Sequence, residues 1–211
     1  MTTPNEKRKA LLGELDVKMH QVRRQLSHAH YEWGAANTHA VFLEWGAKLR
    51  TAISLAESRL DVDIFAHSMR VATLVGDNLP GHRDRFNVED DNTAGLKAMV
   101  VGVLHDLIED QVRGEVVHFR YLIDEFGQEV TDAVEILTRP AVSMMAYSDY
   151  IMDVSTNDLA TQVKIADLED HLSKANASTL KTTLRPRYER AWAQLMEIGT
   201  QRAISRHNEC R

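Results

Sequence analysis

The chain has 211 residues, 44% of them hydrophobic, which is enough for one domain with a substantial core. Its net charge of -6 argues against a nonspecific nucleic-acid binder, and its single cysteine, Cys210, excludes a disulfide framework and a thiolate metal site. No apolar run approaches the ~20 residues that cross a bilayer, and no apolar signal core follows the N-terminus. These features predict a cytoplasmic protein that binds neither membranes nor nucleic acid.

The N-terminal quarter of the chain has a helical pattern. Residues 4 to about 30 carry apolar side chains at helical spacing, and residues 31–58 continue in the same way. We expect residues 1–58 to form a helical extension that packs on the core or mediates self-association. Residues 59–211 would then form the main domain.

The rest of the chain also predicts helices. β-Branched residues occur at helical spacing and not in alternating runs, so no strand is expected and the fold class is all-α. The polar stretch 79–93, which begins Leu-Pro-Gly-His, predicts a loop. The expected helices span residues 61–78, about 93–110, 116–126, 129–138, 147–155, 157–175 and 186–206.

Four ionisable side chains interrupt an apolar run at residues 99–110 (MVVGVLHDLIED). A helix over this run would be mostly buried, so polar groups within it are costly unless something compensates them. On one continuous helix, His105 neighbours Glu109, and Asp106 neighbours both Glu109 and Asp110. Clustered carboxylates repel one another, and a bound divalent cation would remove that repulsion.

Three predicted helices bring suitable metal ligands near the apolar side: His67, the pair His105 and Asp106, and Asp167. Alone, a histidine such as His67 is more often a core residue than a ligand. Together, two imidazoles and two carboxylates can bind one divalent ion and leave positions for water and a substrate oxygen, as octahedral Mn²⁺, Fe²⁺ or Mg²⁺ prefers. Such an ion lowers the pKa of bound water and polarises a phosphoryl oxygen.

Glu109 and Asp110 follow one turn after these ligands. Their carboxylates are placed to orient or deprotonate an attacking water and to assist the leaving group. Alternatively, Glu109 hydrogen-bonds His105 and supports that ligand from behind.

Further polar residues suit phosphate or base binding. Arg70, Arg139 and Lys164 can neutralise phosphates, or they can form salt bridges with neighbouring aspartates. Tyr147 and Tyr150 can stack on a base, although a short amphipathic helix also needs such residues for packing.

Four stretches of the chain resemble the HD-domain phosphohydrolases, above all the hydrolase domain of the RelA/SpoT family and the stand-alone small alarmone hydrolases. These stretches are residues 103–110 (VLHDLIED), 126–139 (FGQEVTDAVEILTR), 147–151 (YSDYI) and 163–167 (VKIAD). The resemblance covers about residues 60–198 and implies an HD-type helical bundle.

The resemblance further implies a Mn²⁺-dependent 3'-pyrophosphohydrolase that converts ppGpp or pppGpp to GDP or GTP plus pyrophosphate, with Fe²⁺, Mg²⁺ or Zn²⁺ as other possible metals. By match to the motifs, Glu109 and Asp110 would be the catalytic pair, and His171 and Lys174 would contact the nucleotide. The implied metal ligands are His67, His105, Asp106 and Asp167.

Two alternatives remain open from the sequence. The family usually has Asn where this chain has His171, and this difference favours an HD-type nucleotidase or deoxynucleotide phosphohydrolase. A metal-stabilised regulatory protein, with the N-terminal helices as its interaction surface, is the other alternative. The Glu109–Asp110 pair disfavours it, because a purely structural metal needs no further buried carboxylates beside it.

Overall fold

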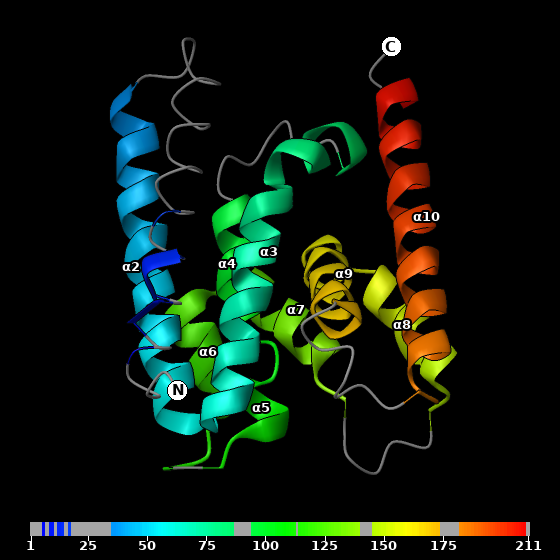
Figure 1. Ribbon diagram of the computed structural model, residues 1–211. Coiled ribbons are helices and arrows are strands. Elements are labelled where there is room, and N and C mark those ends of the chain that lie inside the picture. The colour runs from blue at the N-terminus through cyan, green and yellow to red at the C-terminus, as the bar shows by residue number, and fades with distance from the viewer. Residues whose placement is uncertain are drawn as a thin grey trace.

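The computed structural model describes residues 35–86, 94–112, 114–139, 145–173 and 182–209, together with a few positions between residues 6 and 17. Within these ranges the chain is all-α, as predicted, and contains no strand (Figure 1). The expected helix over residues 4–30 lies largely outside the described residues. The helices are α2 (Ala35–Arg59), α3 (Val62–Phe86), α4 (Ala94–Leu104), α5 (Leu107–Asp110), α6 (Phe119–Phe126), α7 (Gln128–Leu137), α8 (Tyr147–Ser155), α9 (Asp158–Leu172) and α10 (Arg185–Glu209).

Helix α4 forms the centre of the bundle. From Ala98 to Leu104 every one of its residues is buried, because the helix is apolar on all sides. It packs against α2, α3, α7 and α9. Figure 1 shows α2 and α10 at opposite outer sides of the bundle, with α3, α4 and α9 between them. The residues that directly follow α4 are therefore held in the middle of the protein.

Helix α2 belongs to the same core as the rest of the bundle. Four of its side chains are buried there, and they lie at helical spacing: Trp45, Leu49, Ala52 and Ala56. The predicted division into residues 1–58 and 59–211 stays a prediction. No described helix is long and apolar enough to cross a membrane.

Gly102 permits the close approach of α4 to α3. A Cβ atom at this position would lie 2.9 Å from the Cα of Ala72, which is closer than real Cβ contacts. Only glycine fits here without a shift of one backbone. The close approach brings His67 of α3 beside His105, which follows α4.

The prediction of one continuous helix over residues 93–110 is wrong, because the helix is interrupted at His105 and Asp106. Helix α4 ends at Leu104, His105 and Asp106 form a turn, and α5 begins at Leu107. The Nδ1 atom of His105 donates a hydrogen bond of 2.8 Å to the Gly102 carbonyl, which in an unbroken helix would accept from the Asp106 amide. The turn, and not the spacing of one helix, therefore sets where His105 and Asp106 point.

Two other boundaries differ from expectation. Helix α3 continues through Pro80 to Phe86 where a loop was predicted, and Figure 1 shows the helix bending near this end. Proline inside a helix removes one backbone hydrogen bond, which favours such a bend. Helix α6 begins at Phe119 and not at residue 116. The reason is local: the amide of buried Val117 donates to Gln111 Oε1 at 2.8 Å, which holds the preceding segment as a loop.

Local signals predict the remaining boundaries well. Helix α8 has the expected range, and Asn157 caps α9 by accepting a hydrogen bond of 2.9 Å from the Ala160 amide. Gly127 separates α6 from α7 with a φ angle of 90°, a conformation that favours glycine.

Candidate metal centre and active site

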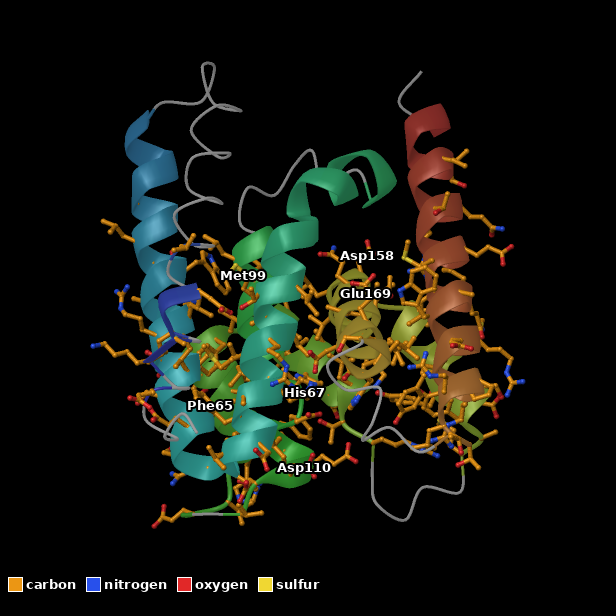
Figure 2. The ribbon with its side chains drawn as sticks, in the orientation of Figure 1. Phe65, His67, Met99, Asp110, Asp158 and Glu169 are labelled. Carbon is orange, nitrogen blue, oxygen red and sulfur yellow. The ribbon has the colours of Figure 1, made fainter. Side chains whose placement is uncertain are left out.

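A single pocket of about 460 Å³ collects the polar residues of interest. Its walls come from α3, the turn after α4, helix α5, the C-terminal end of α7 with the residues after it, and helices α8, α9 and α10. In Figure 2, His67 lies between α3 and α9, and Asp110 lies on α5 toward the lower end of the molecule.

Three side chains in this pocket form a group that can hold a divalent metal ion. The ligand atoms of His67, His105 and Asp167 all lie within 4.8 Å of one another. The Nε2 atom of His67 is 3.0 Å from Asp167 Oδ1, and the Nε2 atom of His105 is 4.0 Å from the same oxygen. Residues from three separate segments therefore converge on one point, as the sequence predicts.

Asp106 lies at the same point. Its Oδ2 atom is 3.2 Å from His105 Nε2 and 3.7 Å from His67 Nε2. The structure thus brings together all four predicted ligands, the fourth being Asp167.

His105 is oriented as a metal ligand. A backbone carbonyl can only accept, so the Nδ1 atom of His105 carries the hydrogen that it donates to Gly102. In the neutral ring, Nε2 then has a free lone pair. This atom is buried and forms no hydrogen bond, although Asp106 is within ion-pair distance. A buried polar atom without a hydrogen-bond partner fits a bound cation.

The charges around His67 also fit a cation. Burial alone would lower the pKa of His67, but hydrogen bonds to Asp167 and Asp170, with the nearby charges, raise it to about 10. Burial would likewise lower the pKa of His105, and the Asp106 carboxylate raises it. A proton on His67 and a bound divalent ion are alternative ways to supply positive charge to the same carboxylates.

Asp167 uses both carboxylate oxygens. Lys164 donates a hydrogen bond of 2.7 Å to Oδ2, while Oδ1 lies 3.2 Å from His171 Nε2 as well as near His67. Burial alone would raise the pKa of Asp167, but the Lys164 charge and these hydrogen bonds hold it well below its usual range. Asp167 is therefore ionised, as a metal ligand must be.

Asp170 is a site residue that the sequence analysis missed. It accepts a hydrogen bond of 2.8 Å from His67 Nδ1 and two from the Arg70 guanidinium, at 2.8 and 2.9 Å. A signal for it existed: Asp170 lies three residues after Asp167 on α9, hence on a neighbouring face of the helix.

The two predicted catalytic carboxylates line the same pocket. The Oε2 atom of Glu109 accepts a hydrogen bond of 3.0 Å from the Arg139 amide, and no hydrogen bond joins Glu109 to His105 among the described residues. Burial raises the pKa of both Glu109 and Asp110. Each carboxyl therefore takes up a proton more readily than it would in water.

The predicted substrate-binding residues divide into three groups. Lys164, His171 and Arg139 line the pocket, the first also pairing with Asp167. Arg70 pairs with Asp170 and does not line the pocket. Lys174 lies outside the described residues.

Helix α10 contributes two pocket residues, Arg187 and Tyr188, to which sequence analysis gave no role in the site. Nothing in the local sequence distinguishes them, because their place in the pocket depends on how α10 packs against α8 and α9.

No model of a known protein family matches this chain, and a search of curated proteins gives no match either.

Proposed function

We propose that this protein is an HD-type, metal-dependent phosphohydrolase that removes pyrophosphate from the 3' position of ppGpp or pppGpp. The observation that carries the proposal is one pocket in which two imidazoles and two carboxylates converge beside the Glu109–Asp110 pair. The choice of ppGpp or pppGpp as the substrate rests on the sequence resemblance to HD-type alarmone hydrolases.

The four converging side chains would hold the metal: His67, His105, Asp106 and Asp167. A mixed set of imidazole and carboxylate ligands suits Mn²⁺, and it is also compatible with Fe²⁺, Mg²⁺ or Zn²⁺. When bound, such an ion supplies Lewis acidity, which makes a water molecule more acidic and polarises a phosphoryl oxygen.

Glu109 and Asp110 supply the proton transfers. Hydrolysis adds one water across the bond between the ribose 3'-oxygen and phosphorus, and it releases GDP and pyrophosphate. One carboxylate takes the proton from the attacking water, and a protonated carboxyl gives a proton to the departing 3'-oxygen. The raised pKa of each group suits both roles.

A second candidate is an HD-type nucleotidase or deoxynucleotide phosphohydrolase. His171 favours it, because the ring at this position lies 4.7 Å from the His67 ring, where the resembling family usually has Asn. A ring stacked beside a ligand presents a different surface to a ribose from that of an amide.

A product assay tests both candidates. Purified, Mn²⁺-loaded protein is incubated with ppGpp, GTP, dGTP and dATP, and the products are resolved by anion-exchange chromatography. GDP plus pyrophosphate from ppGpp alone is the expected result. Phosphate or triphosphate from the other nucleotides would replace the first candidate with the second.

A further inference from the structure

We infer that the pocket contains a second anion-binding subsite, formed by Arg139, Tyr147 and Arg187, which binds a phosphate group other than the one that is hydrolysed. The inference deepens the proposed function and rests on it for the identity of the substrate. It assigns the substrate to nucleotides that carry phosphate groups at two separate positions.

The subsite consists of polar atoms that lack partners. Arg139 Nε, Arg187 Nε and the Tyr147 hydroxyl are buried atoms without a hydrogen-bond partner, and all three residues line the pocket. Burial raises the pKa of Tyr147 to about 12, so its hydroxyl keeps its proton and can donate. Buried donors without acceptors are costly, and three in one pocket wall point to an acceptor that a ligand brings.

The charge of this wall is not neutralised. In the described part of the chain, neither guanidinium forms an ion pair; Arg139 Nη2 donates only to a backbone carbonyl, that of Met145, at 3.2 Å. By contrast, Lys164 pairs with Asp167, as Arg70 does with Asp170. Lys164 and Arg70 thus pair with carboxylates beside His67, whereas the guanidinium groups of Arg139 and Arg187 can bind an anion.

The tyrosine ring holds both guanidinium groups in place. The Cζ atom of Arg187 lies 4.5 Å from the Tyr147 ring centroid, and that of Arg139 lies 5.7 Å from it. Cation–π contacts of this kind fix the planar groups before a ligand binds. An ordered guanidinium presents paired donors that match two oxygens of a phosphate.

A series of ring contacts along the wall of one pocket connects the subsite to the metal centre. Tyr147 contacts Tyr188 at 6.2 Å between centroids, Tyr188 contacts His171 at 5.4 Å, and His171 contacts His67 at 4.7 Å. In the described part of the chain, Arg139, Tyr147 and Arg187 form no hydrogen bond or ion pair with any of the four metal ligands, whereas Lys164 pairs directly with Asp167. The subsite therefore shares no polar contact with the metal centre. A nucleoside that spans the two positions would place one phosphate at each.

Binding of inorganic pyrophosphate to chelator-treated protein tests the subsite without the metal. Isothermal titration should detect binding to the wild type, and Arg187→Gln and Arg139→Gln should each weaken it by about tenfold or more, since each removes a charge-assisted contact. Arg185→Gln is the matched control, because Arg185 begins the same helix and pairs with Glu189. Failure of the wild type to bind, or equal affinity in all variants, would overturn the inference.

A conservative variant separates binding from folding. Arg187→Lys keeps the charge and loses the planar fork, so its affinity for pyrophosphate should lie between those of the wild type and Arg187→Gln. If Arg187→Lys binds pyrophosphate as weakly as Arg187→Gln does and has a native circular dichroism spectrum, the planar guanidinium group itself is required for binding. Wild-type affinity in both would contradict it.

Kinetics then connect the subsite to the substrate. Guanosine 3'-diphosphate and guanosine 5',3'-bis(diphosphate) differ only in the 5'-diphosphate, which the first compound lacks. The wild type should show the lower KM for the bis(diphosphate), and Arg187→Gln should raise that KM by about tenfold while leaving the KM of the 3'-diphosphate unchanged. Equal KM values in the wild type would refute the assignment. If the wild type hydrolyses neither compound, the proposed function fails, and the pyrophosphate titration still decides the subsite.

Discussion

The Nδ1 atom of His67 lies 2.8 Å from Asp170 Oδ2, and the Arg70 guanidinium donates one hydrogen bond to each oxygen of that carboxylate. Burial alone would raise the pKa of Asp170, but the hydrogen bonds from His67 and Arg70 hold it well below its usual range. When His67 gives up its Nε2 proton to bind a metal ion, the ionised carboxylate beside the ring keeps the remaining proton on Nδ1. It thereby directs Nε2 toward Asp167, in the arrangement that carboxylates give to metal-binding histidines.

Asp170→Asn is expected to weaken Mn²⁺ binding by about 10- to 100-fold, because the amide keeps the shape and loses the charge behind His67. Calorimetric titration of the metal measures the effect. Asp158→Asn is the control: it makes the same change at the start of the same helix, where Asp158 pairs with Arg202, and should leave the affinity unchanged. Equal affinities in the two variants would show that Asp170 does not position His67.

The sequence predicts the fold where the signals are local. The range of α8 follows from apolar spacing, and the start of α9 follows from the cap at Asn157. The break at His105 has no such signal, because it depends on a side chain that binds the Gly102 carbonyl at the centre of a packed bundle. The continuation of α3 past Pro80 likewise lacks a local signal.

The sequence predicts the site only partly, for a related reason. His67 and Asp167 could be found from their residue types and from their positions on apolar helix faces, and Asp170 could have been found from its spacing on α9. Arg187 and Tyr147 could not be paired in advance. Their contact across 4.5 Å exists only because α10 packs against α8, 40 residues away in the chain.

Glu109→Gln and Asp110→Asn are expected to keep the metal and to lose most of the turnover, by about 10²- to 10⁴-fold in kcat, because each removes a group that transfers a proton. Metal content is measured by titration, and kcat is measured with ppGpp. Glu125→Gln serves as control, since Glu125 is exposed on α6 and lies outside the pocket. Wild-type turnover in either site variant would mean that the other carboxylate, or neither, carries the proton.

Asp106→Ala should abolish both metal binding and activity, because it removes a charged ligand. Thermal unfolding gives an independent readout. Mn²⁺ at about 100 times its Kd stabilises a protein that binds it only when folded by about 2.7 kcal/mol, so chelation should lower the Tm of the wild type. The Tm of Asp106→Ala should not respond to a chelator, whereas Asp124→Ala, which alters an exposed carboxylate of α6, should respond as the wild type does. A chelator shift of the same size in Asp106→Ala would place the ion elsewhere.

Two glycine substitutions should change stability in opposite directions. Gly102→Ala puts a Cβ atom 2.9 Å from the Cα of Ala72, and overpacking of this kind costs about 1–3 kcal/mol. It should also weaken Mn²⁺ binding, because the same contact sets the distance between His67 and His105. Gly46→Ala, within α2, meets only the end of the Arg50 side chain at 3.8 Å, so it should stabilise the helix by about 1 kcal/mol. Denaturant unfolding and a metal titration measure both variants. A stable Gly102→Ala variant with unchanged metal affinity would show that α3 and α4 can separate without disturbing the site.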